Sequence, residues 1–499
     1  MHDLHPTPHR RQAMWSLVAL ALISTGCGPQ DSIGSEARSD LVHVEGLGSL
    51  SFPNSGAAAA QDAFRRGVLL LHSFEYAPAA AAFREAQSAD PDFALAYWGE
   101  AMTYNHPLWR EKDHERAREA LGRLAPTAAE RRAKAGSERE AMYLDAVEAL
   151  YAGGSKADED LAYAEAMARL SEAFPDDQEA RAFHSLAILG TADGSRDFAT
   201  YMKAAATAQP VFDLNPDHPG AAHYIIHSFD DPVHAPLGLE AAREYSDIAP
   251  NAAHAQHMTT HIFVAMGMWE DVIAGNTRAR DTQDGARAED GLPPNYCGHY
   301  SSWLQYGHLQ IDEDTEAGAL MDLCHGSMAE APSGGEQFYF ASMRARQIVD
   351  TEDWALAGRW PAELEGNAAF FKDVTDAFAA LRAGDPAPAR ALVASTSRPE
   401  PGFDRIMIDQ LRGLLLIADG NAERGLSLVR EAAEAEDALP FEFGPPRLVK
   451  PGFELLGEEL LLQGRVAEAE AAFRRAVERT PGRELAVRGL GAARGSDNP

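Results

Sequence analysis

The chain has few cysteines and few basic residues for its size. Its 499 residues include three cysteines, too few for a disulfide framework or a thiolate zinc cluster to hold the fold. Acidic residues outnumber basic ones by 76 to 44, which gives a formal charge of −32. This charge repels phosphate backbones and argues against nucleic acid as a partner. Cys297 and Cys324 can pair, but the sequence leaves their state open.

Familiar catalytic motifs are missing as well. The segment "HERAR" at His114 lacks the second histidine of an HExxH metalloprotease motif, and the chain has no phosphate-cradling glycine loop and no GxSxG elbow. Binding is therefore a better expectation than catalysis.

Long apolar runs are missing beyond the N-terminus. Near the start, two arginines precede an apolar run over residues 13–23, which is too short to span a bilayer and has the length of a signal-peptide core. The run leads to "ISTGC", which resembles the bacterial lipobox, whose cysteine receives lipid and becomes the mature N-terminus. The sequence predicts a lipoprotein-like signal peptide over residues 1–26, lipidation of Cys27 and a flexible tether over residues 27–55. We expect an exported protein of the cell envelope that touches a membrane only through a lipid anchor.

Strand signals are almost absent, whereas alanine-rich segments with helical spacing recur along the rest of the chain. Two segments, "RRGVLLLHSFEYAPAAAAFREAQSADP" and "LLGEELLLQGRVAEAEAAFRRAVERTP", match the 34-residue tetratricopeptide pattern. The matching positions are Gly67, Leu70, Tyr76, Ala79, Phe83, Ala86 and Pro91 in the first segment, and Gly457, Leu460, Gly464, Ala469, Phe473, Ala476 and Pro481 in the second. Small residues sit where helices approach closely, and each phenylalanine fills the space between helix pairs. The sequence predicts an all-α, right-handed superhelical solenoid of antiparallel helix pairs over residues 56–499, with degenerate central repeats and insertions.

Beyond the generic repeat, three long segments resemble a group of large bacterial tetratricopeptide-repeat proteins with histidine-rich repeats. They include "HSFEYAPAAAAFREAQSADPDFALAYWGEAMTYNHPLW", "AAHYIIHSFDDPVHAPLGLEAAREYSDIAPNAAHAQHMTTHIF" and "FEFGPPRLVKPGFELLGEELLLQGR". The resemblance implies the repeat fold and no particular activity. Repeats of this kind usually bind proteins or peptides in a concave groove lined by the first helix of each pair. We therefore expect a scaffold whose partner is a protein or peptide in that groove.

Two pairs of histidines recur at the repeat period. "AAHYIIHSFDDP" carries His223 and His227, and thirty-four residues later "AQHMTTHIF" carries His257 and His261. Residues four apart share one helix face, and neighbouring first helices lie roughly 8–10 Å apart, so four imidazoles can converge on one ion. Imidazole and carboxylate together suit zinc, copper or iron. Further candidate ligands nearby are His254, His218, Asp230, Asp231 and His234.

Three interpretations of these histidines stay open at this point: a transition-metal site, a structural polar ladder, or side chains that contact a groove-bound peptide. His72 and His106 are also thirty-four residues apart, fall late in the expected first helices of the first two units, and are predicted to line the groove. His299 and His308, each taken alone, are expected to be ordinary partly buried residues. The alternative to a scaffold is a metal-binding protein, and a metalloenzyme if a coordination position stays free beside Asp230.

Overall fold

The computed structural model describes residues 41–194, 196–328, 332–397, 399–441 and 443–495. The predicted signal peptide, the lipidation site Cys27 and the first part of the predicted tether lie outside the described residues. The last part, residues 41–55, is packed: β1 (Val42–Val44) pairs antiparallel with β2 (Gly48–Leu50), and Ser49 N–H donates to the carbonyl of Asp217. The tether predicted over residues 27–55 is therefore wrong for this part.

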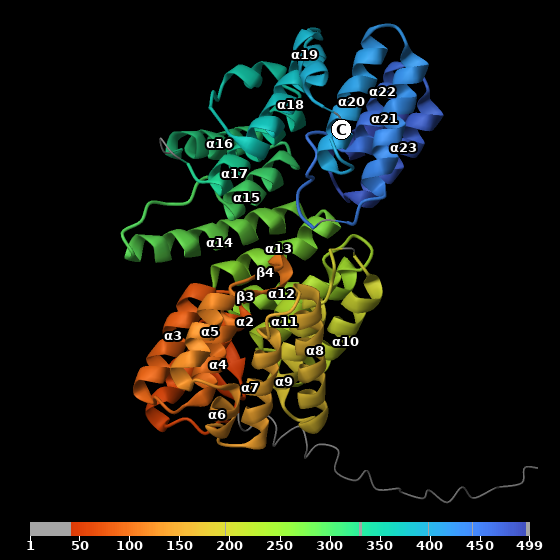
Figure 1. The fold of residues 1–499 in the computed structure, drawn as a ribbon. Coiled ribbons are helices and arrows are strands. Elements are labelled where there is room, and N and C mark those ends of the chain that lie inside the picture. Colours follow the sequence, from red (N-terminus) through yellow and green to blue (C-terminus); the bar gives the residue numbers. More distant parts are fainter. Residues whose placement is uncertain (1–40, 195, 329–331, 398, 442, 496–499) are drawn as a thin grey trace, which may run out of the picture. The chain divides into compact units, whose positions relative to one another are not determined.

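Helices make up most of the described chain (Figure 1). The first eleven α-helices are α2 (Gln61–His72), α3 (Tyr76–Ala89), α4 (Ala94–Met102), α5 (His114–Leu124), α6 (Ala128–Ala133), α7 (Glu138–Leu150), α8 (Lys156–Ala173), α9 (Gln178–Gly190), α10 (Phe198–Leu214), α11 (Pro219–Phe229) and α12 (Ala235–Ile248). They are followed by α13 (Ala253–Met266), α14 (Trp269–Glu289), α15 (His299–Leu309), α16 (Asp314–Ser327), α17 (Gly334–Asp350), α18 (Gly366–Arg382), α19 (Ala387–Ser395), α20 (Phe403–Ala418), α21 (Ala422–Asp437), α22 (Gly452–Leu462), α23 (Val466–Arg479) and α24 (Glu484–Ala493).

Short elements connect some of these helices. They are the 3₁₀ helices η1 (Ala58–Ala60), η2 (Pro107–Trp109) and η3 (Trp354–Gly358), and the two-residue strands β3 (Asn105–His106) and β4 (Glu111–Lys112), which pair antiparallel. Consecutive helices pack as pairs, among them α2 with α3, α11 with α12, α13 with α14 and α22 with α23. The all-α prediction is confirmed. Within the described ranges, no helix has the length and apolarity needed to cross a membrane.

The N-terminal repeat shows how the sequence pattern produces the packing. Phe83 in α3 is fully buried and lies between Gly67 of α2 and Gly99 of α4. A Cβ on Gly67 would stand 2.8 Å from the Phe83 ring, and a Cβ on Gly99 would stand 2.2 Å from it. Glycine is needed at both positions because the ring takes the space that any larger residue would fill.

The C-terminal repeat has the same arrangement. Phe473 in α23 is fully buried between Gly457 of α22 and Gly489 of α24, where added Cβ atoms would approach its ring to 2.8 and 2.3 Å. Both sequence matches to the tetratricopeptide pattern are thus helix pairs with an aromatic residue between them, as predicted.

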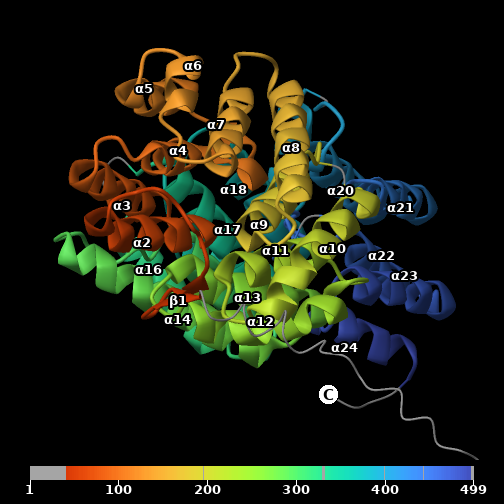
Figure 2. The same ribbon diagram turned by 90° about the horizontal axis from the view of Figure 1, so that it is seen from below.

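The histidine-bearing segments also form the predicted elements. α11 begins at Pro219, a residue suited to the first helical position. The preceding residue, His218, caps the helix, because its Nδ1 accepts the N–H of Ala221. α13 ends before Gly267, whose φ of +69° closes the helix in the left-handed region. Figures 1 and 2 both place α11 between α9 and α13, and α11 contacts both helices. The first helices of consecutive repeats are therefore neighbours.

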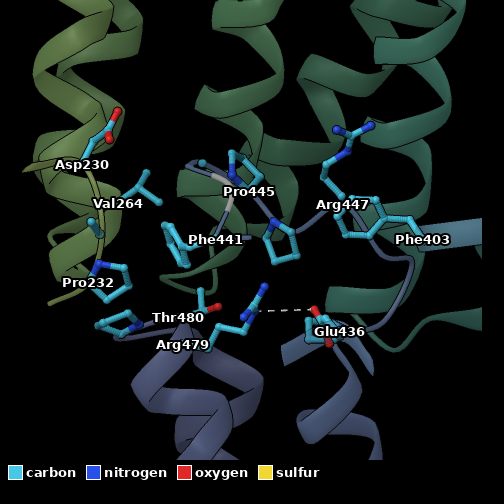
Figure 3. A pocket seen from close by; sticks show the side chains of 15 residues that line it. Asp230, Pro232, Val264, Phe403, Glu436, Phe441, Pro445, Arg447, Arg479 and Thr480 are labelled. Carbon is cyan, nitrogen blue, oxygen red and sulfur yellow. Dashed lines mark ion pairs between the residues drawn. The ribbon is translucent and has the colours of Figure 1, made fainter. Parts of the chain in front are cut away.

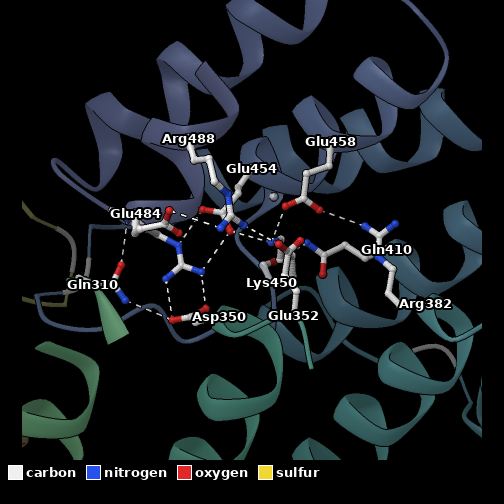
Figure 4. Close-up of polar contacts among 12 residues, drawn as sticks. Gln310, Asp350, Glu352, Arg382, Gln410, Lys450, Glu454, Glu458, Glu484 and Arg488 are labelled. Carbon is white, nitrogen blue, oxygen red and sulfur yellow. Dashed lines mark hydrogen bonds and ion pairs between the residues drawn. The ribbon is translucent and has the colours of Figure 1, made fainter. Parts of the chain in front are cut away.

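A buried network of charges joins the C-terminal helices to α17 (Figure 4). Arg483 Nη2 lies 2.7 Å from Asp350 Oδ1 of α17, and Arg483 Nε lies 2.7 Å from Glu454 Oε2 of α22. Lys450 Nζ lies 2.9 Å from the other oxygen of Glu454. Each of these four side chains is at most 4% exposed, so every charge depends on its partners rather than on water.

Candidate metal centre

The first helices α11, α13 and α15 bring six histidines into one continuous run of rings. Neighbouring ring centroids along the run lie 4.4 to 6.2 Å apart. Their nitrogens form two groups, and within each group one nitrogen per ring lies within 4.8 Å of the others. The first cluster consists of His223, His227 and His254; the second cluster consists of His257, His261 and His299. The four histidines predicted to share one site thus fall into these two groups, and one from each, His227 and His261, also forms a group with Asp230.

Both clusters are built by the same rule. Each takes two histidines four residues apart on one first helix, and a third from the beginning of the first helix of the next repeat. His254 is the second residue of α13, and His299 is the first residue of α15. The helical repeat therefore duplicates the cluster as it duplicates the fold.

In the first cluster the Nε2 atoms of all three histidines are buried, and no group in the described part of the chain bonds to them. The Nδ1 atoms of two of these rings face an acceptor. His223 Nδ1–H donates to the carbonyl of His72 at 2.6 Å, and His227 Nδ1 lies 3.5 Å from Asp230 Oδ2. Because a carbonyl or an ionised carboxylate only accepts, Nδ1 carries the proton and Nε2 carries a lone pair. Outer groups hold metal-binding histidines in this way.

In the second cluster the Nε2 atoms meet one another. His257 Nε2 lies 3.1 Å from His261 Nε2 and 2.9 Å from His299 Nε2. Three imidazole nitrogens around a tetrahedral ion at about 2.0–2.1 Å would stand roughly 3.3 Å apart. The two observed separations are about 0.2 and 0.4 Å shorter than this and are also within the range of hydrogen bonds.

Outer groups also fix the protons of His257 and His261 in the second cluster, whereas Nδ1 of His299 lies 3.0 Å from the hydroxyl of Tyr339, which can donate or accept. His257 Nδ1–H donates to Asn276 Oδ1 at 2.8 Å, and Asn276 is oriented because its amide donates to the carbonyl of Val272. His261 Nδ1 lies 3.2 Å from Asp230 Oδ2, so its proton also points away from the cluster. When neutral, His257 and His261 therefore direct lone pairs at each other, a repulsive arrangement that a cation between them removes.

One buried carboxylate serves both clusters. Asp230 follows the end of α11, and Arg196 bonds to its other oxygen and also to Asp231. Burial by itself raises the pKa of Asp230, but Arg196 and the two imidazoles outweigh it and hold the pKa well below its ordinary range. Asp230 therefore stays ionised and acts as a hydrogen-bond acceptor for His227 and His261 at once.

Burial favours the neutral, metal-binding form of several of these histidines. Burial, reinforced by the neighbouring imidazoles, lowers the pKa of His223, His254 and His257 well below 6.5. The pKa of His299 falls to about 3, through burial and then the charges of His261 and Arg346. A neutral imidazole is the species that donates a lone pair to a transition metal.

A third histidine group is chemically different. Glu179 accepts from His72 Nε2 at 2.8 Å and from His218 Nε2 at 3.2 Å. The remaining nitrogen of His72 bonds to Tyr224, and that of His218 accepts the helix-capping N–H described above. Every nitrogen has a partner, so this group is a satisfied network that supports α11. His72 is fully buried here, and the prediction that it lines a groove is wrong.

The other candidates fall outside both clusters. His106 lies in β3 beyond the end of α4, not late in a helix, and its ring stacks on Tyr76 with centroids 4.0 Å apart. Its side chain is 32% exposed and borders a surface pocket. Asp231 accepts two backbone N–H groups and His234 Nδ1, which fixes the turn after α11.

Aromatic rings cover the clusters. Phe74 packs on His223 with centroids 4.2 Å apart and has a φ of +56°, a conformation that a bulky residue seldom adopts. Trp303 stacks on His261 at 4.8 Å. The long connection between α21 and α22 adds Phe443, whose ring lies 5.0 Å from that of His261. Only the structure shows that this connection reaches the clusters.

The same connection closes most of the space on its side of the clusters. Figure 3 shows Phe441, Pro445 and Arg447 facing Asp230 and Val264 across a small pocket. The cavity measures about 50 Å³. It has room for only a few waters.

Comparison with known proteins finds no matching family model and no matching curated protein. Among solved structures, the chain is similar to a monomeric mutant of IFIT1 with Gppp-AAAA, at 11% identity over 87% of this chain and 90% of that chain, with a TM-score of 0.36. It is also similar to yeast Tom70, at 13% identity over 88% and 95% of the two chains, with a TM-score of 0.31. The P58(IPK) TPR domain matches at 14% identity over 88% and 98%, with a TM-score of 0.20.

Likenesses this distant carry no inference about function. The repeat class is set by the chain's own features: consecutive helix pairs, a 34-residue period, and Phe83 and Phe473 each wedged between two glycines. The resemblance to a histidine-rich group of such proteins stays a prediction. The fold itself is an array of tetratricopeptide-type helix pairs.

Proposed function

We propose that this protein is a metalloprotein whose helical array binds two transition-metal ions, one in each three-histidine cluster. The observation that carries the proposal is the set of three buried Nε2 atoms in the first cluster, to which no described group bonds. A buried lone pair without a partner is costly; His223 and His227 each carry one at Nε2, close to the equally unpartnered Nε2 of His254, and an ion between these rings would explain them.

The ligand set narrows the choice of ion. Six imidazoles without a thiolate or a coordinating carboxylate suit zinc or copper and do not suit magnesium or calcium, which prefer oxygen. Of the nearby carboxylates, Asp230 faces the Nδ1 side of His227 and His261 and is paired with Arg196, and Glu75 accepts the backbone N–H of His254. Three protein ligands at each ion also leave a coordination position for another molecule, as in catalytic rather than structural zinc sites.

The two other interpretations of the histidines fit less well. A structural polar ladder satisfies its members, as the Glu179 network does, but it would leave the Nε2 atoms of the first cluster without partners. Contact with a groove-bound peptide requires exposed side chains, and His223 and His257 are fully buried. Arrays of helix pairs are binding scaffolds as a class, so a protein partner elsewhere on the array is compatible with the metal sites.

Elemental analysis tests the proposal directly. The mature chain, purified without a histidine tag or a chelating column, should contain about two equivalents of zinc or copper. Treatment with a chelator should lower the melting temperature, and adding back the same metal should restore it. If the chain holds substoichiometric metal and its melting temperature does not change with zinc or copper, the histidines have a structural role and the proposal is wrong.

We further propose that the protein is exported and anchored through Cys27. The lipobox-like segment motivates the proposal, and the buried disulfide between Cys297 and Cys324 supports it, because such bonds persist in oxidising compartments. Mass spectrometry of the native N-terminus should find a chain that begins at an acylated Cys27. A mature chain that begins elsewhere and has no acyl mass would remove the anchor.

A further inference from the structure

A pocket of about 430 Å³ lies where the two clusters come closest to the surface. It is bordered by His254 of the first cluster and His299 of the second, the two ligands that begin their helices. Both side chains are only partly buried, whereas the other four histidines of the clusters are buried. A molecule in this pocket therefore stands beside one proposed ligand residue of each ion.

The walls of the pocket are aromatic. Trp109 lies with its ring centroid 5.8 Å from that of His254, and Tyr300 and Tyr339 each lie 5.9 Å from His299. Trp109 is 50% exposed, although large aromatic residues are usually covered. Exposed rings around a small pocket are typical of sites that bind a planar molecule by stacking.

The pocket is bordered by few charged side chains. Among the described residues that border it there is no lysine or arginine. The carboxylate of Glu336 is engaged at the start of α17, where it accepts from the Ser333 N–H and hydroxyl. Attraction for an anionic atom would therefore come from the proposed ions themselves.

We propose that this pocket binds a phenol or catechol, with the ring against Trp109 and the oxygen, as phenolate, as a ligand of one proposed ion. The hydroxyl proton leaves to solvent when the oxygen coordinates. The inference rests on the proposed metal sites and adds the class of molecule that reaches them.

Cobalt(II) serves as the probe because its visible absorption reports changes in coordination. The chelator-treated protein is loaded with cobalt(II) and titrated with catechol, and in a parallel titration with cyclohexanol, which has the same ring size but no acidic hydroxyl. We expect catechol to change the cobalt bands saturably and cyclohexanol to leave them unchanged. Trp109→Ala should weaken catechol binding about three- to tenfold, with cobalt content unchanged.

Phe198→Ala is the matched control, because Phe198 is also about half-exposed, packs on His234, which belongs to neither cluster, and does not border the pocket. It should bind catechol as the unmodified protein does. If cobalt produces no bands, the metal sites themselves are refuted. Bands that catechol does not alter, an equal response to cyclohexanol, or unchanged affinity in Trp109→Ala would overturn the pocket assignment and leave the metal sites standing.

Discussion

His227 of the first cluster and His261 of the second cluster share one acceptor, the Oδ2 atom of Asp230, at 3.5 and 3.2 Å from their Nδ1 atoms. The shared oxygen fixes the tautomer of one ligand in each cluster, and it makes the two clusters a coupled pair.

Asp230→Asn should therefore lower the affinity of both clusters for their ions. The neutral amide holds the two imidazoles less firmly and lowers their basicity, so each affinity should fall about 10–100-fold. Competition against a chromophoric chelator measures both affinities. Asp231→Asn is the matched control, because Asp231 also pairs with Arg196 but bonds to no histidine of either cluster. A loss confined to one ion would contradict the shared role.

Removing the third ligand of one cluster should release the ion of that cluster and leave the other ion bound. His254→Ala should release the ion of the first cluster, and His299→Ala should release that of the second, so each variant retains about one equivalent after dialysis. His308→Ala should retain both, because His308 bonds to Glu313 away from the clusters. If either single variant loses both ions, or neither loses any, the division into two sites is wrong.

The sequence alone predicted the fold and some of the histidines that cluster. Phe83 and Phe473, each with glycines at fixed spacing, predicted helix pairs at both ends of the array because the pattern reflects local packing. The HxxxH pairs, spaced one repeat apart, predicted four of the six clustered histidines.

The grouping of the ligands was not predictable from the repeat period. Each cluster takes its third histidine from the following repeat, and only the contact between neighbouring helices shows which rings meet. His299 follows His257 by 42 residues, whereas His254 follows His223 by 31, because α14 runs to Glu289 and a connection follows it. That insertion shifts His299 out of register, so it looked like an isolated residue. The tertiary approach of Phe443 had no local signal at all.

The two wedged phenylalanines should be equally important for stability. Phe473→Ala and Phe83→Ala should each lower the free energy of unfolding of their repeat by about 3–5 kcal/mol, because a fully buried ring leaves a cavity between two helix pairs. Phe338→Ala, at a ring that is 44% exposed on α17, should cost less than 1 kcal/mol or so. Hydrogen exchange of amides in the affected helices measures the local change. Equal protection in Phe473→Ala and the unmodified chain would mean that this ring does not hold the pairs together.

The charge network around Arg483 should make the C-terminal helices sensitive to acid. Burial alone raises the pKa of Glu454, but Arg483 and Lys450 outweigh it and lower the pKa to about 2. Because this is below the value near 4.3 of an unfolded glutamate, the unfolded chain binds the proton more tightly. The contribution of Glu454 to the free energy of unfolding is thus fully present above about pH 4.3, is lost as the pH falls towards 2, and amounts to roughly 3 kcal/mol at most.

Denaturant unfolding of metal-free protein measures this contribution. The unmodified chain should be more stable than Glu454→Gln at neutral pH, and the difference should shrink as the pH falls through this window. Glu434→Gln, at an exposed position on α21, should follow the unmodified chain at every pH. Curves for Glu454→Gln and the unmodified chain that stay parallel down to pH 2 would show that Glu454 is not held ionised by Arg483 and Lys450.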